Sequence, residues 1–352
     1  MRIEDLDYEL PPELVAQEPS AERDGSRLLV IRREGQAPAG HRRFRDLPGL
    51  LREGDLLVLN DAAVFPARLE LRRPTGGRFD ALLLEPLSDD PARWEALVNA
   101  HNKLRVGEAL AVEGAAGVTM HLEARGAGTW TVRFEGAADG RALAERAGRM
   151  PLPPYIRRER GRDPRDEIDR ERYQTVYARD PVAAAAPTAG LHFTPELLAA
   201  CEARGVAVAR VTLAVGPGTF RPVTAERVED HPMHAERWRI PEAAADAVRR
   251  TRGAGGRVVA VGTTAVRTLE AAAAASPDGL PGAGEGSTDL FIMPGHRFRA
   301  VDALLTNFHL PRSTLLALVM AFAGVDRIRS AYAEAVRERY RFFSYGDAML
   351  VQ

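Results

Sequence analysis

The stretch Val258-Val259-Ala260-Val261-Gly262-Thr263-Thr264-Ala265-Val266-Arg267 decides the fold class. Its four apolar residues predict a buried strand, and the glycine with two hydroxyl residues predicts that this strand runs directly into a helix. The free N–H groups of such a helix start lie at the carboxyl end of the strand, where open α/β sheets bind ligands. We therefore take Gly262, Thr263, Thr264 and Arg267 as candidate ligand-binding residues. The full glycine spacing of a dinucleotide or phosphate loop is absent, and the two threonines could serve only as helix caps.

Similar pairs of strand and helix occupy the chain after residue 155. Apolar runs typical of strands lie at 206–215, 257–261 and 303–307, and helical runs follow them at 241–252, 264–275 and 314–322. A last helix is predicted over 325–340 and an early strand over 28–31. This alternation is typical of an α/β domain.

The middle of the chain has a different sequence pattern. Between residues 64 and 136, short β-type runs recur about every 10 to 15 residues, and Gly, Pro and Asp between them leave no room for long helices. The runs are 67–71, 79–84, 94–99, 109–112, 118–123 and 129–134. Such spacing predicts a small all-β barrel or sandwich. We expect a discontinuous α/β main domain of residues 1–61 and 153–352, interrupted by an inserted all-β barrel domain of residues 62–152.

Two segments fit neither the α/β pattern nor the all-β pattern. In 157–172, 13 of the 16 residues are charged, which predicts a solvated connector. Residues 281–287, Pro-Gly-Ala-Gly-Glu-Gly-Ser, are predicted to form a flexible loop.

Composition restricts the class of protein. The chain has 352 residues, of which 45% are hydrophobic and 28% charged, as in an ordinary globular protein of about two domains. A net charge of -1 means that any polyanion must be met by a local patch. The single cysteine, Cys201, excludes an intramolecular disulfide and a multi-cysteine metal site. The longest apolar stretch, 315–324, is too short to cross a bilayer, and the first ten residues hold no apolar signal segment, so we expect a cytoplasmic protein.

Four histidines stand in unusual sequence contexts. They are His192 in Leu191-His192-Phe193, His231 and His234 in His231-Pro232-Met233-His234-Ala235-Glu236, and His309 in Phe308-His309-Leu310. Histidine suits acid and base catalysis at neutral pH, although each of these could be only a structural hydrogen-bonding residue. A zinc site of His231, His234 and Glu236 is an alternative, but the spacing is not that of a helical metalloprotease.

Three further strings could contact a ligand or RNA. Gly216-Pro217-Gly218-Thr219-Phe220 gives either a backbone that a ligand can approach closely or a tight turn. Arg23-Asp24-Gly25-Ser26-Arg27 offers two arginines or a surface ion pair. Arg339-Tyr340-Arg341-Phe342-Phe343-Ser344-Tyr345-Gly346-Asp347 interleaves arginines and aromatics, as a platform for single-stranded nucleic acid does, and packing at a helix end would produce much the same string.

Taken together, the strings of this chain match one family nearly from end to end. The matching strings include Asp7-Tyr8-Glu9-Leu10-Pro11, Asn60-Asp61, Pro151-Leu152-Pro153-Pro154-Tyr155-Ile156, Tyr173-Gln174-Thr175-Val176-Tyr177-Ala178, Ala186-Pro187-Thr188-Ala189-Gly190-Leu191-His192-Phe193-Thr194, Gly216-Pro217-Gly218-Thr219-Phe220, Gly262-Thr263-Thr264, Thr306-Asn307-Phe308-His309-Leu310-Pro311 and Ser344-Tyr345-Gly346-Asp347-Ala348. On these strings the chain resembles the S-adenosylmethionine:tRNA ribosyltransferase-isomerases of queuosine biosynthesis.

The resemblance implies an unusual use of S-adenosylmethionine. Its ribosyl part would be transferred and isomerised onto the aminomethyl group of 7-aminomethyl-7-deazaguanine at the tRNA wobble position. The products would be epoxyqueuosine in tRNA, adenine and methionine. S-adenosylmethionine would be the ribosyl donor, with no prosthetic group and no metal, and the partner would be a tRNA carrying the deazaguanine. We expect a monomer without membrane contacts.

The resemblance also suggests roles for individual residues. Proton transfer is expected from His192, His231 and His234, with Glu236 as an orienting residue or alternative base, and with Tyr173 or Tyr177 as alternatives. Residues expected to hold the methionine carboxylate or ribose hydroxyls are Gly262, Thr263, Thr264 and Arg267. Contacts to adenine or the deazaguanine are expected from Asn307 and His309. A wobble base presented single-stranded is held by stacking and by arginine. Contacts to tRNA are therefore expected from Arg23, Arg27, Tyr155, Arg341 and Tyr345.

Two other functions are compatible with parts of the sequence. The barrel could belong to a non-catalytic RNA-binding protein of the OB type, although the net charge near zero argues against it. The chain could also be a tRNA methyltransferase that uses S-adenosylmethionine. Against this, the glycine-rich loop with an acidic residue about twenty positions further on is absent.

Overall fold

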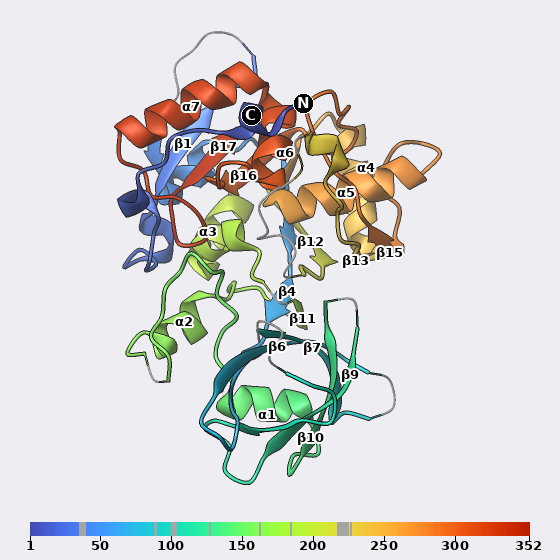
Figure 1. Cartoon of the computed structure of the whole chain (residues 1–352). Coiled ribbons are helices and arrows are strands. Elements are labelled where there is room, and N and C mark those ends of the chain that lie inside the picture. Colours follow the sequence, from blue (N-terminus) through green and yellow to red (C-terminus); the bar gives the residue numbers. More distant parts are fainter. Residues whose placement is uncertain are drawn as a thin grey trace.

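Among the residues that the structure describes, nine strands form one mixed sheet in the larger part of the molecule (Figure 1). The structure is a computed structural model, and it describes residues 1–34, 40–87, 90–99, 104–126, 128–161, 163–183, 185–216, 225 and 227–352. The strands, in their order across the sheet, are β15 (Gly284–Thr288), β13 (Glu236–Ile240), β12 (Ala207–Leu213), β3 (Leu56–Asn60), β14 (Val258–Val261), β16 (Ala303–Asn307), β17 (Ala348–Val351), β1 (Arg27–Ile31) and β2 (Gly40–Arg43).

The centre of this sheet is parallel. The strands β12, β3, β14 and β16 run side by side in the same direction, so their carboxyl ends meet at one edge. On either side of this centre the pairing is antiparallel, between β12 and β13 and between β16 and β17. The predicted α/β architecture is therefore confirmed.

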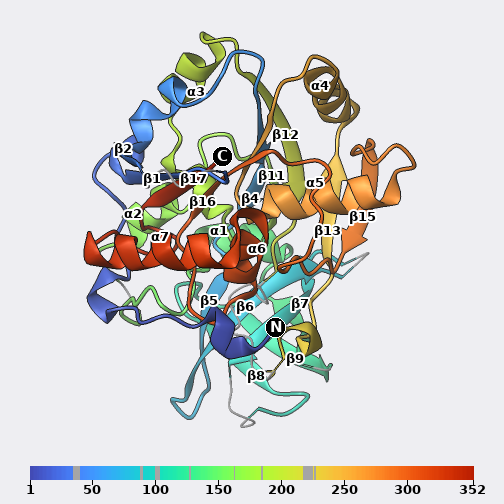
Figure 2. The ribbon, with the colours of Figure 1, turned by 90° about the horizontal axis from the view of Figure 1, so that it is seen from above.

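Helices cover both faces of the sheet, as a parallel centre requires. Along β3, Leu56 and Val58 pack on one face, whereas Leu57 and Leu59 pack on the other, and all four are fully buried. The first face is covered by α4 (Glu242–Gly253), α5 (Thr263–Ala275), α6 (Thr314–Ala323) and α7 (Val325–Arg337). The second face is covered by α3 (Pro195–Glu202) and the 3-10 helix Phe44–Gly49. Figure 2 shows α6 and α7 on one side of the strands and α3 on the other.

The middle of the chain forms a closed antiparallel barrel at the opposite end of the molecule (Figure 1). Its strands are β5 (Arg68–Arg72), β6 (Arg78–Pro86), β7 (Arg93–Asn99), β8 (Ala109–Val112), β9 (Thr119–Arg125) and β10 (Trp130–Glu135). The helix α1 (Gly140–Ala147) packs Leu143 and Ala144 against the barrel core. A Cβ atom at Gly140 would lie 2.2 Å from Trp94 Nε1, so this close approach of helix and barrel requires glycine. The inserted barrel is confirmed, and the exact boundaries at residues 62 and 152 stay a prediction.

A short two-stranded ladder connects the two parts. The strand β4 (Ala62–Val64), on the way into the barrel, pairs in parallel with β11 (Asp180–Ala183), on the way back. This ladder lies between the sheet and the barrel in Figure 1.

The sequence interpretation was wrong for the two irregular segments. Residues 284–288 form strand β15 against β13, not a flexible loop, because the backbone groups of Glu236–Ile240 pair with them. The charged segment 157–172 is not a solvated connector either. It contains the helix α2 (Asp166–Arg172) and two buried carboxylates, Asp163 and Asp169.

Long-range ion pairs hold this charged segment. Asp169 is 2% exposed, and its Oδ1 accepts hydrogen bonds from Arg158 Nη2 at 2.8 Å and from the Tyr345 hydroxyl at 2.9 Å. Arg149, at the end of the barrel insertion, forms ion pairs with Glu70 of β5 and with Asp166 of α2. The segment therefore joins the barrel to the main domain.

Removing the carboxylate of Asp169 should destabilise the protein strongly. In Asp169→Ala the buried guanidinium of Arg158 loses its partner, and we expect a loss of about 3 to 5 kcal/mol in the free energy of unfolding. Urea denaturation measures it. Glu167→Ala, on the exposed side of the same helix, is the control and should change stability by less than about 0.5 kcal/mol. Equal effects of the two substitutions would contradict the role of Asp169.

Candidate functional site

The carboxyl ends of the parallel strands form the wall of a hollow, here called the first hollow. The segment after β14 contributes Gly262, Thr263 and Thr264, and the segment after β16 contributes Asn307 to Pro311. Gly262 has a φ of 87°, a backbone conformation that favours glycine, and this lets the strand turn into α5. The remaining lining residues are Tyr155, Ala186, Pro187, Thr188, Ala189, Val215, Thr306, Ser313, Leu315, Phe343 and Ser344.

No Asp, Glu, Lys or Arg lines the first hollow among the described residues. Its only titratable imidazole is that of His309, whose Nε2 lies 2.9 Å from Thr306 Oγ1. Burial lowers the pKa of His309 to about 3, so this ring is neutral at neutral pH. The hollow therefore suits an uncharged group with several hydrogen-bonding atoms.

His192 lies behind the first hollow and is fully engaged. Its Nδ1 lies 2.8 Å from Ser26 Oγ, and its Nε2 lies 3.2 Å from Asn307 Nδ2. The ring is 4% exposed and packs against Phe44 at a centroid distance of 4.9 Å. Burial, with a smaller contribution from Arg341, lowers the pKa of His192 to about 3. In this arrangement His192 positions Asn307 rather than facing the hollow.

A second hollow adjoins the first, and Leu315 lines both. It contains the titratable groups that the first hollow lacks: His231, His234, Glu236 and Arg267. Burial, and then the neighbouring His234, lower the pKa of His231 below its ordinary value. The structure thus brings His231, His234 and Glu236 together, as the sequence predicts, and separates them from His192 and Tyr173.

Glu236 and Arg267 form a buried ion pair at the wall of the second hollow. Arg267 Nε also donates to the Leu290 carbonyl at 3.2 Å, and Glu236 Oε1 accepts from the Gly216 N–H at 3.0 Å. The carboxylate that Arg267 holds here is therefore that of Glu236. Because Glu236 also fixes Gly216, it positions the start of the string 216–220, of which residues 217–220 lie outside the described residues.

The candidate tyrosines differ in access. Burial raises the pKa values of Tyr173 and Tyr177 above the ordinary value, so both phenols stay protonated. Tyr173 is fully buried and packs edge-on against Tyr345. Tyr345 is 3% exposed and donates to Asp169, so its ring presents no open face to a base. Only Tyr155 lines the first hollow, with its hydroxyl 2.6 Å from Ser344 Oγ.

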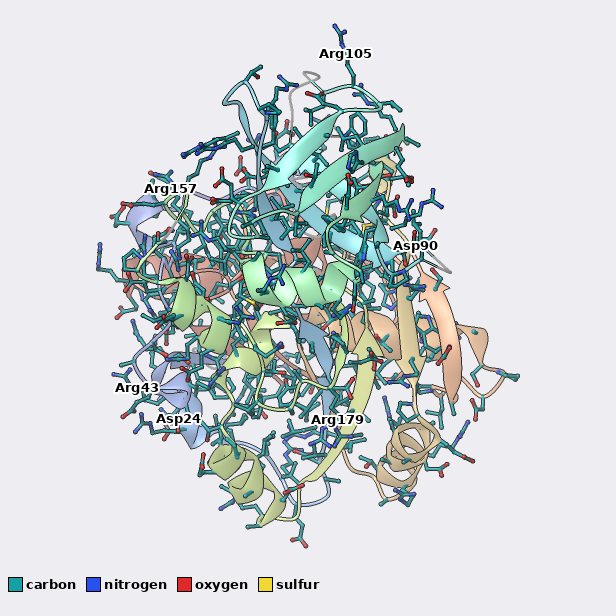
Figure 3. The ribbon with its side chains drawn as sticks, turned by 90° about the horizontal axis from the view of Figure 1, so that it is seen from below. Asp24, Arg43, Asp90, Arg105, Arg157 and Arg179 are labelled. Atoms are coloured by element: carbon teal, nitrogen blue, oxygen red, sulfur yellow. The ribbon has the colours of Figure 1, made fainter. Side chains whose placement is uncertain are left out.

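The arginines predicted to contact tRNA are tied to the protein itself. Arg23 donates to the carbonyls of Gln174, Leu191 and Glu171. Arg27 lies 3.7 Å above the ring of Tyr340, and Arg341 donates to the Glu18 carbonyl. The C-terminal aromatics are mostly buried, so packing at the helix end explains the string 339–347. Figure 3 shows other arginines in more open positions. Arg43 and Arg157 lie on the side of the molecule that carries Asp24, and Arg105 projects from the barrel.

Several lining residues were missed by the sequence reasoning. Thr188, Thr306, Ser313 and Ser344 line the first hollow but were not singled out. Thr306 could have been found, because it is the last residue but one of a strand whose carboxyl end is at the site. Within the described ranges, no three His, Cys, Asp or Glu side chains are arranged to hold a metal ion, and no helix is long and apolar enough to cross a membrane.

The two buried histidines should make stability depend on pH. Their folded pKa values, about 3, lie below the ordinary value of about 6.5, so the unfolded chain binds more protons between these limits. The stabilisation is complete above about pH 6.5 and is lost as the pH falls toward 3. Between pH 7 and pH 5 the protonation of each histidine in the unfolded chain should lower the free energy of unfolding by about 2 kcal/mol.

Urea denaturation at pH 7 and pH 5 tests this dependence. His309→Gln should lose about 2 kcal/mol less than the wild type between the two values. His121→Gln, on the barrel surface, should behave as the wild type does. A loss that His309→Gln leaves unchanged would show that His309 is not held neutral by burial.

Comparisons with known proteins identify the family of the chain. The family model described as "Queuosine biosynthesis protein" matches residues 3–351. An S-adenosylmethionine:tRNA ribosyltransferase-isomerase of Anaeromyxobacter sp. (strain Fw109-5) is 57% identical over 352 residues, with 100% of this chain and 99% of that protein covered. One of Geobacter sulfurreducens is 52% identical, with both chains fully covered. The crystal structure of S-adenosylmethionine tRNA ribosyltransferase from Thermotoga maritima is 40% identical, covers 99% of this chain and 100% of that chain, and has a TM-score of 0.55. The chain belongs to the family of S-adenosylmethionine:tRNA ribosyltransferase-isomerases of queuosine biosynthesis.

Proposed function

We propose that the chain transfers and isomerises the ribosyl group of S-adenosylmethionine onto the 7-aminomethyl-7-deazaguanine at the tRNA wobble position, giving epoxyqueuosine in tRNA, adenine and methionine. The observation that carries this proposal is the pair of adjoining hollows, one with no charged side chain among its described lining residues and one with two histidines and an ion pair. The donor is divided in the same way. Its adenosine part is uncharged, whereas its sulfonium and amino acid groups carry charge.

The chemistry needs proton transfer next to the sulfonium. A sulfonium acidifies the adjacent 5′ carbon, so that a positioned base can remove a proton there, and an acid helps adenine leave. The amine on the deazaguanine must also lose a proton before it attacks. We assign these transfers to His231 and His234, because they line the hollow that fits the charged part of the donor. The lowered pKa of His231 keeps its imidazole neutral and able to accept a proton.

The other proposed catalytic residues act through their neighbours. Glu236 holds the wall of the second hollow in place, because one of its oxygens pairs with Arg267 and the other accepts from the Gly216 N–H. His192 holds Asn307. Tyr173 is fully buried behind Ser344 and Ala186, which line the first hollow, and we assign it a packing role at this wall.

Donor binding is assigned to the edge of the sheet. Gly262, Thr263 and Thr264 present the N-terminus of α5 and two hydroxyls to the first hollow, which suits ribose oxygens. Asn307 and His309 line the same hollow. Arg267 supports this wall through Glu236 instead of binding the donor carboxylate directly.

For tRNA we keep Tyr155 as the proposed stacking residue, because it alone of the predicted contacts lines the first hollow. Arg23, Arg27, Arg341 and Tyr345 shape the surface around it through the contacts described above. We also propose that the protein acts as a monomer, because residues of a single chain line both hollows.

Product analysis tests the activity. Purified protein with S-adenosylmethionine and tRNA that carries the aminomethyl-deazaguanine should release adenine and methionine in equal amounts, and only with the modified tRNA. Release of S-adenosylhomocysteine would instead identify a methyltransferase. Tight tRNA binding without any release would favour a binding protein.

A variant of His231 tests the assignment of the second hollow. His231→Gln should lower kcat by roughly 100-fold to 10,000-fold, because a general acid or base contributes about that much. The Kd for tRNA should stay within about tenfold, as expected when chemistry rather than binding is lost. His41→Gln, far from both hollows at the edge strand β2, serves as the control. A kcat of His231→Gln equal to that of the control would remove His231 from the mechanism.

A further inference from the structure

Two buried asparagines end two parallel strands of the same sheet, and only one of them is satisfied. Asn60 ends β3, and its Oδ1 accepts from the N–H groups of Leu213 at 3.0 Å and Ala62 at 3.1 Å. Its Nδ2 donates to the Leu213 carbonyl at 3.2 Å. Asn307 ends β16, is 2% exposed, and its Oδ1 has no hydrogen-bond partner in the described structure. The side-chain amide of Asn60 is fully hydrogen-bonded within the protein, whereas the side-chain oxygen of Asn307 has no hydrogen-bond partner in the described structure.

The orientation of the Asn307 amide is fixed by its neighbours. Nδ2 donates to the Phe343 carbonyl at 3.2 Å, and a carbonyl can only accept, so the nitrogen must face it. The same nitrogen faces His192 Nε2 at 3.2 Å, which therefore accepts. The ring hydrogen then lies on Nδ1 and is donated to Ser26 Oγ. A flip of the amide would place Oδ1 against the Phe343 carbonyl, where neither oxygen can donate, so Oδ1 is held on the other side as an acceptor.

A buried acceptor without a partner is costly and calls for an explanation such as a ligand. Asn307 lines the first hollow, and so does Thr264, whose Oγ1 is also buried without a partner. Two incomplete polar groups in one hollow indicate a ligand that offers a donor to Asn307 and is met by the hydroxyl of Thr264. Among the described residues no charged side chain lines this hollow, so an uncharged group with a hydrogen-bond donor suits it better than an ammonium does.

We propose that Asn307 Oδ1 accepts a hydrogen bond from the 6-amino group of the adenine of S-adenosylmethionine and so selects the purine of the donor. This inference rests on the proposed function and deepens it. Adenine is the uncharged part of the donor, and its exocyclic amine is a donor at the edge where ring nitrogens accept. The aminomethyl group of the deazaguanine and the amino acid end of the donor are ionised, and they suit the second hollow better.

The test compares two donors on the same enzyme. Rates of methionine release, with modified tRNA at saturation, give kcat/KM for S-adenosylmethionine and for its analogue with hypoxanthine in place of adenine. The analogue replaces the amine by a carbonyl, which faces Asn307 Oδ1 with an acceptor. The ratio compared is kcat/KM for S-adenosylmethionine divided by kcat/KM for the analogue. In Asn307→Ala this ratio should fall about tenfold to a hundredfold relative to wild type, because the Oδ1 acceptor that disfavours the carbonyl of the analogue is removed.

The comparison does not depend on how well a variant folds. Both donors are measured on one preparation, so inactive protein cancels in the ratio, and the different reactivity of the analogue is the same in every variant. Asn307→Ser is a second variant if Asn307→Ala yields too little protein. Asn60→Ala is the matched control, because it removes an equally buried asparagine whose amide is satisfied within the protein. It should keep the ratio of the wild type.

Three results would overturn the inference. An unchanged ratio in Asn307→Ala and Asn307→Ser would show that Asn307 does not contact the adenine amine. A raised KM for the modified tRNA with an unchanged donor ratio would place the deazaguanine there instead. If the wild type releases no adenine or methionine from S-adenosylmethionine itself, the proposed function and the inference both fail. If the wild type is active and the ratio is unchanged in the Asn307 variants, the inference alone fails.

Discussion

The parallel alignment of β12, β3, β14 and β16 is the constraint on which the rest of the structure depends. It brings the carboxyl ends of these strands to one edge, where chain segments far apart in sequence, after residues 213, 261 and 307, line the same two hollows. A parallel centre must be buried on both faces, and the alternate packing of β3 on the two helix layers meets that requirement. The site therefore lies at the edge of a sheet that is buried on both faces.

The inserted barrel completes this site through the chain that leaves it. The return segment first supplies Tyr155 to the first hollow, then passes along α2 and β11, and then supplies residues 186–189. The half-buried ion pair of Arg149 with Glu70 attaches this segment to the barrel, and the Tyr345 hydroxyl, which donates to the buried Asp169, attaches it to the C-terminal string. Charge in this segment thus fixes geometry, and at the second hollow the Glu236–Arg267 pair does the same.

Much of the fold could be predicted from the sequence, because it follows from local patterns. All six barrel strands lie within one or two residues of the predicted runs, and the strand and helix of 258–275 begin where the glycine and threonines indicate. Strands β3, β4, β11, β13 and β17 were not among the predicted runs, although 56–59 and 348–351 are apolar. Strands β2 and β15 were not predicted either, since they are short edge strands that carry no apolar pattern and depend on their partners. The buried ion pairs of Asp163 and Asp169 were also hidden, because both partners looked like solvated charge.

The candidate site could be predicted in its place but not in its roles. His231, His234 and Glu236 do lie together, and Asn307 and His309 do line the first hollow. Burial, which the sequence does not show, encloses His192 and Tyr345, and Arg267 pairs with Glu236, 31 residues away in the sequence. Such distinctions depend on tertiary contacts alone.

A crystal structure with S-adenosylhomocysteine bound tests the central claim most directly, because that compound keeps the adenosine and amino acid parts of the donor. The account predicts the adenine in the first hollow with its amine at hydrogen-bond distance from Asn307 Oδ1, and the amino acid end in the second hollow near His231. Adenine bound away from the carboxyl ends of β14 and β16, or the reverse orientation across the two hollows, would contradict it.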